Sequence, residues 1–259
     1  MAFEMKKGQS AVWIILAVFL LAAILLYLFL QDPAVDVVPV LGGDPGIKSY
    51  LESCTTLFVL EATDIMLPQG GFIEPRNFVY FNRTKVEYVC ETMSYFEPCI
   101  QQHPMLIREM EREIKNYILS NVSECFVEMK DTFEDMGWTV SFSSALDIEV
   151  DLKPDKAIVY LNKEMTVRKA DSTKSFESFE IPVRSAAYNL GVIAQEIATQ
   201  EANFCYFESA GFSLAYPQYN VRRKMMSYQQ KVYLLRDKRL EDDMMVAVRS
   251  CALPEGMPG

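Results

Sequence analysis

Twenty consecutive uncharged residues near the N-terminus, 11–30, constrain this 259-residue chain more than any other feature. As a helix rising about 1.5 Å per residue, this segment is roughly 30 Å long, which matches the hydrocarbon core of a bilayer. Lys6 and Lys7 precede the segment and acidic residues follow it. The positive-inside rule therefore predicts a single-pass transmembrane helix over 9–31, with the N-terminus cytoplasmic and the C-terminal part outside the cell membrane.

A conventional secretory signal is one alternative, but such signals have an apolar stretch of about 7–15 residues and a small-residue cleavage site. Here the run is longer, and no Ala-x-Ala motif occurs in it or directly after it. A plain signal anchor fits well. A third alternative rests on the run Lys6-Lys7-Gly8-Gln9-Ser10, which resembles the class III (type IV pilin-like) signal sequence of archaeal surface proteins. That resemblance implies cleavage between Gly8 and Gln9, with 1–8 as a removable basic leader.

The fifth residue after that cleavage site departs from the pilin pattern. Pilins usually carry Glu there, where it can pair with the N-terminal amine of a neighbouring subunit, whereas this chain has Trp13. The missing carboxylate disfavours ordinary filament assembly and favours a minor, tip-like or membrane-held subunit. We expect membrane lipid around the helix, with copies of this chain or other pilin-like subunits as partners through it.

The remainder of the chain predicts a linker followed by a folded exterior domain. Residues 32–46 contain six Pro and Gly residues and no helical periodicity, which predicts a linker that spans at most about 50 Å. In 47–259, apolar spacing of three and four predicts helices over 47–66, 104–129 and 182–203. Alternating apolar residues predict strands at 78–81, 85–89, 139–142, 146–152, 157–161, 165–169, 176–181, 219–225, 231–236 and 244–249.

Short polar turns join these strands, and one of them is expected at Asn162-Lys163. Such turns are typical of antiparallel neighbours. We therefore expect an α+β ectodomain, with one antiparallel sheet covered on one face by about three helices.

All six cysteines lie in the expected exterior part, and an even count there predicts three structural disulfides with fifteen pairings open. Two of the six fall on the apolar stripes of neighbouring predicted helices, which favours joining them. Two others are only nine positions apart, and the last two are then left for each other. The expected pairs are Cys54–Cys125, Cys90–Cys99 and Cys205–Cys251.

Charge and motif content exclude several classes of function. The net charge of −10 disfavours a nucleic-acid partner. The chain has one histidine, His103, and no Cys-x-x-Cys pair, so a zinc site is not expected. No Gly-x-Ser-x-Gly, His-Glu-x-x-His or phosphate-binding glycine loop occurs. We expect a protein that is not an enzyme and has no cofactor.

Several residue groups could still carry function, and each has a plainer interpretation. His103 precedes a proline that can begin a helix, which favours a capping or exposed role. Acidic and basic residues alternate over 108–115, which predicts a solvent face with ion pairs along the helix. Asp131, Glu134 and Asp135 could offer oxygens to calcium, but their spacing does not fit an EF-hand.

Two further motifs concern the surface and a turn of the expected domain. The run 69–71, Gln-Gly-Gly, could shape a ligand loop, but ending a helix is the simpler role. The sequons at Asn82 and Asn121 could accept glycans, and Asn82 is the better placed because it falls in a predicted turn.

Scattered motifs of the exterior part also resemble a family of uncharacterised archaeal membrane-anchored surface proteins. The motifs are YLESC at 50–54, QGGFI at 69–73, LRD at 235–237 and VAVR at 246–249. The resemblance implies surface location and an α+β ectodomain, and supplies no activity.

These observations predict a membrane-anchored, pilin-like cell-surface structural or adhesion protein with a disulfide-stabilised ectodomain. The first alternative is an anchored ligand-binding or receptor module, favoured by Trp13 in place of the pilin glutamate. The second is a surface hydrolase, which would need several carboxylates converging in a deep cleft.

Overall fold

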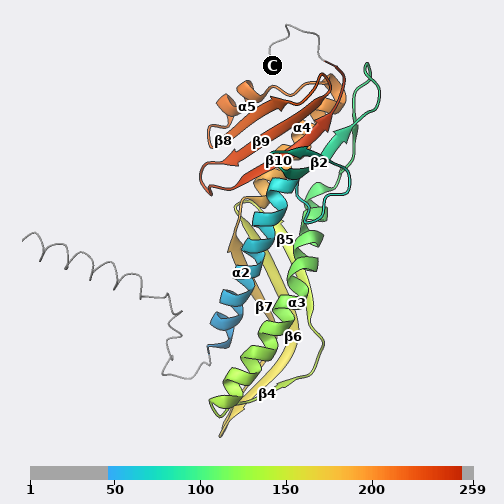
Figure 1. Ribbon diagram of the computed structural model, residues 1–259. Helices are drawn as coiled ribbons and strands as arrows, with labels where there is room; N and C mark the ends of the chain where they lie inside the picture. Colours follow the sequence, from blue (N-terminus) through green and yellow to red (C-terminus); the bar gives the residue numbers. More distant parts are fainter. Residues whose placement is uncertain (1–45, 253–259) are drawn as a thin grey trace, which may run out of the picture. The chain divides into compact units, whose positions relative to one another are not determined.

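The computed structural model describes residues 46–252 (Figure 1). This part of the chain has the predicted α+β class, with four α-helices and two β-sheets. The helices are α2 (Ile47–Met66), α3 (Leu106–Asp135), α4 (Ala187–Phe204) and α5 (Ser209–Ala215), and the 3-10 turn η1 (Leu67–Gln69) follows α2.

The expected leader 1–8, the transmembrane helix 9–31 and the linker up to residue 45 lie outside the described residues, as do the processing residues Gly8 and Gln9. Within 46–252, no helix combines the length and hydrophobicity that a bilayer crossing requires.

The two long helices α2 and α3 lie side by side along one sheet (Figure 1). The bounds of α2 are those predicted, whereas α3 continues six residues beyond the predicted end at Met129. Phe133, four positions after Met129, continues the buried stripe, so the same face remains covered for one more turn. The helix ends before Gly137, whose φ of 80° is a conformation that glycine adopts easily.

The third predicted helix begins later than expected. Pro182 does not start it but lies inside strand β7 (Ser172–Arg184), opposite Ile158, and α4 begins at Ala187. Strand β7 has only one neighbour among the described strands, so a proline without an N–H is tolerated at its free edge. The alternation of buried Ile181 and Val183 around this proline is a strand pattern.

The larger sheet joins the second quarter of the chain to its C-terminal part. Its order is β1-β2-β10-β9-β8, and β3 pairs with the end of β2. The expectation of a purely antiparallel sheet is wrong here, because β2 and β10 run parallel, with Ala247 opposite Tyr88. No hairpin connects these two strands, so their direction depends on tertiary packing. The strands are β1 (Phe78–Phe81), β2 (Thr84–Glu91), β3 (Ile100–Gln101), β8 (Tyr219–Met225), β9 (Gln230–Asp237) and β10 (Asp243–Arg249).

The smaller sheet is an antiparallel meander built on one long strand. The central strand is β6 (Lys156–Lys169), which has β7 along one edge and both β4 (Thr139–Phe142) and β5 (Asp147–Lys153) on the other. The turn expected at Asn162-Lys163 does not form. The strand instead continues through a register shift between Asn162 and Met165, which absorbs the irregularity without reversing the chain.

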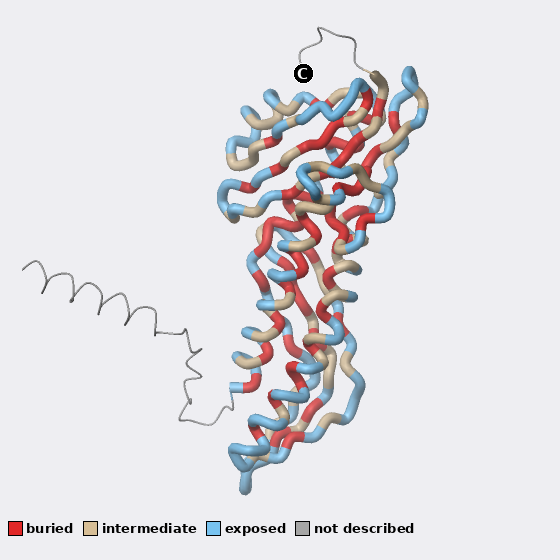
Figure 2. The backbone as a smooth tube through the Cα atoms, in the orientation of Figure 1, coloured by how far each residue is buried: buried red, intermediate tan, exposed pale blue. Residues whose placement is uncertain are grey.

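The expected single sheet with three helices on one face is therefore replaced by two sheets with separate helical covers. Helices α2 and α3 cover the smaller sheet, and α4 packs on β2, β9 and β10 of the larger one. Buried residues are concentrated where helices and strands pack together (Figure 2), and Val86, Tyr88, Val232 and Ala247 of the larger sheet form a small buried cluster of their own. Most other buried apolar side chains form one large hydrophobic core shared by both sheets, with members from Ile47 to Val248.

A polar cluster links the turns of the two sheets. Asn189 of α4 donates to Asp155, in the β5–β6 turn, at 2.6 Å and to buried Asp237 of β9 at 3.2 Å. The Arg239 guanidinium lies 2.8 Å from Asp155 and 3.3 Å from Asp237. Because Asp237 is sealed from water, these donors offset the desolvation of its carboxylate.

Three disulfides join the cysteine pairs that the sequence analysis expects. Cys54–Cys125 links α2 to α3, Cys90–Cys99 links β2 to the residue before β3, and Cys205–Cys251 links the end of α4 to the chain after β10. Structural disulfides form and persist in oxidising compartments. Three of them in this unit indicate an extracytoplasmic domain.

Candidate functional site

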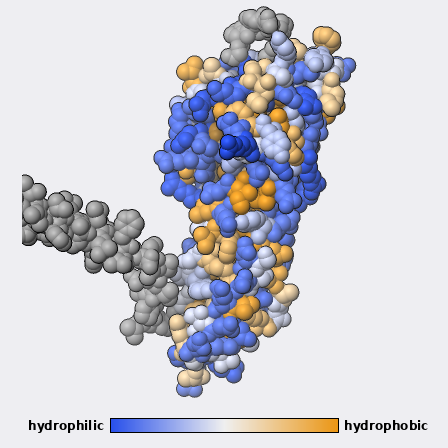
Figure 3. Space-filling model, viewed as in Figure 1, coloured by the Kyte–Doolittle hydropathy of each residue, from blue (hydrophilic) through white to orange (hydrophobic). Residues whose placement is uncertain are grey.

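The Cys90–Cys99 disulfide closes a loop at one end of the larger sheet, which we call the disulfide loop (residues 90–99). The loop presents apolar side chains to solvent: Phe96 is 93% exposed, Met93 81% and Tyr95 59%. In the space-filling view, apolar groups interrupt a mainly hydrophilic surface at this end of the molecule (Figure 3). Clustered apolar exposure of this kind is typical of interaction surfaces.

The loop backbone is fixed by hydrogen bonds to two other segments. The amide N–H of Thr92 donates to the carbonyl of Arg249 at 2.8 Å, which continues the β2–β10 pairing beyond the end of β2. Gln229, a buried residue of the β8–β9 turn, donates from Nε2 to the carbonyl of Ser94 at 2.7 Å. These bonds join the loop to the larger sheet.

Further contacts hold the part of the loop that carries the apolar side chains. The N–H of Ala252 donates to the carbonyl of Tyr95 at 3.0 Å. The Arg249 guanidinium lies 2.9 Å from Glu91 and donates to the Met93 sulfur at 3.1 Å. The backbone is thus ordered on both sides of Phe96 while the side chains face water. Ordering before binding reduces the entropy that a complex would cost.

The β8–β9 turn adds apolar surface beside the loop. Gln229 of this turn makes the hydrogen bond to the loop described above. Two other side chains of the turn, Met226 and Tyr228, are exposed. We call these two side chains, together with those of Met93, Tyr95 and Phe96, the apolar tip.

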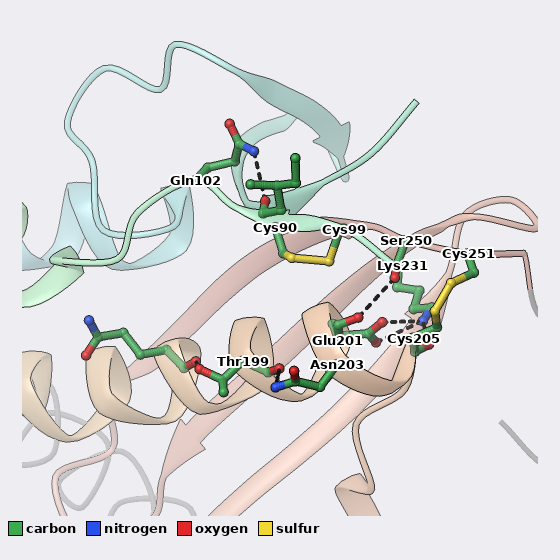
Figure 4. Close-up of a disulfide and its surroundings, with 12 residues drawn as sticks. Cys90, Cys99, Gln102, Thr199, Glu201, Asn203, Cys205, Lys231, Ser250 and Cys251 are labelled. Carbon is green, nitrogen blue, oxygen red and sulfur yellow. Dashed lines mark hydrogen bonds and ion pairs between the residues drawn. A yellow bond between two sulfur atoms is a disulfide. The ribbon is translucent and has the colours of Figure 1, made fainter. Parts of the chain in front are cut away.

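A buried ion pair lies under this end of the sheet (Figure 4). The Lys231 Nζ of β9 is 2.6 Å and 2.8 Å from the two carboxylate oxygens of Glu201, near the end of α4. Lys231 also donates to the Cys205 carbonyl, and the Tyr233 hydroxyl donates to Glu201. Glu201, Lys231 and Tyr233 are all 0% exposed.

Burial controls the titration of this cluster. It lowers the pKa of Lys231, although the Glu201 carboxylate acts in the opposite direction. Burial and the same carboxylate raise the pKa of Tyr233. A lysine, a carboxylate and a tyrosine at hydrogen-bonding distance resemble acid–base machinery, but a substrate cannot reach side chains that are wholly sealed. The cluster instead attaches α4 to β9.

The Cys205–Cys251 disulfide and Ser250 reinforce the same attachment. Ser250, directly after β10, donates from Oγ to the Glu201 carbonyl at 3.3 Å, and Cys251 is bonded to the residue that ends α4 (Figure 4). The chain segment that meets the disulfide loop at Ala252 is therefore itself anchored.

His103 occupies a more connected position than the expected cap or exposed side chain. Its Nδ1 lies 2.7 Å from Glu109 of α3, and its Nε2 lies 3.3 Å from Glu87 of β2. The Phe72 ring is centred 4.6 Å from the imidazole. Burial lowers the pKa of His103, but the two carboxylates outweigh burial and the net effect is a raised pKa.

Glu87 is the buried partner in this group. Its carboxylate accepts hydrogen bonds from the backbone N–H groups of Arg76 and Asn77, at 2.7 Å and 3.1 Å, in addition to its contact with His103. A cavity of about 180 Å³ opens beside the group and is lined also by Arg112, Glu113 and Asn116, among others. Each of the three glutamates here already accepts from a protein donor, as the Glu113 carboxylate does from Ile73 N–H.

The prediction of ion pairs along the helix over 108–115 is wrong about the bonding partners of the glutamates. The glutamates of this stretch bond to other elements: Glu109 to His103, Glu111 to the N–H of Leu152 in β5, and Glu113 to the N–H of Ile73. The helix therefore uses these carboxylates to hold neighbouring segments. Sequence spacing shows only that these charges share a helix, and not which segments pass beside it.

The glycines at 69–71 have the helix-ending role that we considered simpler. Gly70 ends η1 with φ of 86°, and Gly71 follows with φ of 95°. A Cβ on Gly71 would lie 2.9 Å from the Met110 side chain, so the turn also needs glycine for close packing on α3.

The remaining candidates are placed on the surface. Asn82 is exposed in the β1–β2 turn with φ of 47°, and Asn121 is partly exposed on α3. Asp131, Glu134 and Asp135 are exposed in the last turns of α3. Across 46–252, no three His, Cys, Asp or Glu side chains are arranged to hold a metal ion.

The apolar tip is not among the sites predicted from the sequence. A signal was present, because Met93, Tyr95 and Phe96 lie between two closely spaced cysteines and outside every predicted helix and strand.

Comparison with known proteins finds no matching family model, no similar curated protein and no similar solved structure.

Proposed function

We propose that this protein is a membrane-anchored cell-surface protein that adheres to, or assembles with, another surface protein through its apolar tip. The observation that carries the proposal is a loop with an ordered backbone and exposed apolar side chains. An unbound protein gains no stability from presenting Phe96 to water. The disulfide, the hydrogen bonds and the Arg249 contacts nevertheless hold the loop in that conformation.

Two independent features support the proposed placement of the protein. The apolar run 11–30 and the lysines before it support a single span with the N-terminus in the cytoplasm. The three disulfides support an exterior position for the folded domain. The class III signal resemblance supports membership of the archaeal surface protein family, with Trp13 favouring a minor or membrane-held subunit.

A non-enzymatic role fits the polar groups of the domain. The Glu201–Lys231–Tyr233 cluster is sealed from solvent, and the carboxylates around His103 are all engaged by protein donors. The first cluster cannot meet a substrate, and every carboxylate of the second already accepts a hydrogen bond from the protein, which favours adhesion over hydrolysis.

Cells that display the full-length protein provide the test. Phe96→Ser should lower the fraction of cells that aggregate or that bind a hydrophobic surface, because it removes the most exposed ring of the apolar tip. Leu214→Ser is the matched control, since Leu214 is 84% exposed on α5, outside the tip. Surface labelling should show equal display of both variants. Equal adhesion of Phe96→Ser and the parent protein would exclude the tip as the adhesive surface.

A further inference from the structure

A second surface site lies between α4 and the α5–β8 segment, as a groove of about 610 Å³. Four aromatic side chains line it: Tyr188 from α4, Phe212 from α5, Tyr216 directly after α5, and Tyr219 from β8. Figure 1 shows α5 beside the β8 edge of the larger sheet, away from β2, which leads into the disulfide loop. The groove is therefore separate from the apolar tip.

The aromatic wall of the groove is held in place by its own contacts. The Phe212 ring packs 4.9 Å from the Tyr216 ring and 5.5 Å from the buried Phe207 ring. The N–H of Tyr219 donates to the Tyr216 carbonyl at 2.9 Å. Glu208 caps α5 by accepting from its first amides. The rings do not need to be ordered by a ligand.

The groove also has a defined electrostatic sign. Among its lining residues, all within the described part of the chain, Glu196 is the one charged side chain, and there is no Lys, Arg or His. The Glu196 carboxylate accepts from Gln200 Nε2 at 2.7 Å and has no ion-pair partner within 46–252. Its second oxygen and its negative charge remain available to a ligand.

Aromatic faces and an unpaired carboxylate together favour a cation. The face of an aromatic ring is negative and attracts guanidinium and ammonium groups, more strongly when water is excluded. One ring of the groove and one ring outside it already have such partners within the protein: the Arg239 guanidinium lies 5.9 Å from the Tyr219 ring, and that of Arg223 lies 4.7 Å from the Tyr206 ring. An anionic ligand would be repelled by Glu196, and a purely apolar ligand would partly desolvate that carboxylate without supplying a positive charge.

We infer that this groove binds an arginine- or lysine-bearing segment of another protein, with the cationic side chain between the aromatic rings and Glu196. The net charge of −10 assists the approach of a basic partner over longer distances. A volume of about 610 Å³ accommodates a long basic side chain with its adjacent backbone.

The test uses the full-length protein in nanodiscs of zwitterionic lipid, titrated with acetyl-Gly-Arg-Arg-Gly-amide and followed by calorimetry or NMR. We expect saturable binding of this peptide and none of acetyl-Gly-Nle-Nle-Gly-amide, which has apolar side chains of similar length. Glu196→Gln and Tyr216→Leu should each weaken binding about 5- to 10-fold. Both side chains are exposed, so neither change should disturb folding.

Matched controls separate the groove from general charge attraction. Glu124→Gln removes one exposed carboxylate from α3, and Tyr80→Leu removes one exposed ring from β1, and both should bind the peptide like the parent protein. Equal loss in Glu124→Gln and Glu196→Gln would show attraction to net charge alone and would overturn the proposal. Equal binding of the norleucine peptide would do the same. A neutral trisaccharide that binds in a Tyr216-dependent but Glu196-independent manner would assign the groove to glycans instead.

Discussion

At the scale of single residues, Lys231 and Glu201 illustrate how a buried charge acts on stability. Both are 0% exposed, and their lost hydration is replaced by hydrogen bonds within the protein, with the partner charge, Tyr233 and the Cys205 carbonyl. Such a pair adds little net stability compared with apolar residues of similar shape. Removing one member is costly, because the other charge is then left without its partner.

Lys231→Met should therefore lower the free energy of unfolding by about 3–5 kcal/mol, measured by chemical denaturation of the full-length protein in detergent. The double variant Glu201→Leu with Lys231→Met should recover most of this loss. Lys130→Ala is the control, because the Lys130–Glu134 pair is partly exposed, with 3.8 Å between its charged atoms, and contributes at most about 1 kcal/mol. Comparable losses for Lys130→Ala and Lys231→Met would contradict this account.

His103 should make stability depend on pH. Its folded-state pKa is raised, since Glu87 and Glu109 favour the charged imidazole more than burial opposes it. The imidazole therefore binds its proton more tightly in the folded state than in the unfolded state. The resulting stability is complete below the unfolded pKa of about 6.5 and is lost as the pH rises through the folded pKa.

A comparison of the parent protein with His103→Gln measures this contribution. The difference in melting temperature should be largest near pH 6 and should shrink as the pH is raised above neutrality. A difference that stays constant from pH 6 to pH 9 would mean that the imidazole acts by packing on Phe72 and not by its charge.

At the scale of elements, the disulfide between α2 and α3 and the disulfide of the loop 90–99 differ in what they constrain. Cys54–Cys125 joins residues 71 positions apart and restricts the unfolded chain more. In the chain-entropy model this restriction stabilises the folded protein by about 4 kcal/mol. Cys90–Cys99 closes only nine positions, for about 2.6 kcal/mol in the same model. Its larger effect should be local, because it keeps the disulfide loop in one conformation.

We expect Cys90→Ala with Cys99→Ala to raise the hydrogen exchange of amides in 91–98 while leaving α2 and α3 protected. Adhesion should fall with loop order, although Met93, Tyr95 and Phe96 are all still present. Cys54→Ala with Cys125→Ala is the comparison, and it should lower global stability without changing adhesion at permissive temperature. Unchanged exchange in the loop would show that its hydrogen bonds to Arg249 and Gln229 suffice.

Strand β7 shows how an element boundary depends on position in the sheet. A proline at a suitable point before an apolar helical stripe predicts a helix start at Pro182. The strand is an edge strand among those described, where a proline is tolerated, and it continues to Arg184. Edge position is a tertiary property that no local pattern contains.

At the scale of the whole molecule, processing of the N-terminus distinguishes a pilin-like subunit from a plain signal anchor. If the class III resemblance holds, N-terminal sequencing or intact mass of protein from its native membrane should show a chain that begins at Gln9. Gly8→Leu should block this cleavage and leave the basic leader attached. A parent protein that retains Met1 or Lys6 would exclude pilin-type processing while leaving the single span and the disulfide-bonded domain unaffected.

The sequence by itself determined the features that depend on local periodicity and covalent spacing. These are the α+β class, the bounds of α2, the strands 78–81, 139–142 and 219–225, and the three cysteine pairs. Helical and strand burial repeat at fixed intervals along the chain, and cysteines on facing stripes have few compatible partners.

Only the tertiary structure decided which distant segments meet. The division into two sheets and the parallel β2–β10 pair join residues far apart in the chain. The carboxylates around His103 and the groove between α4 and α5 bring together side chains from several elements. Their contacts depend on how the layers pack and on which strand edges remain free. That packing is determined by the whole core together, and not by any one segment of the chain. The apolar tip belongs with them, because the bonds that fix it come from β10 and the β8–β9 turn.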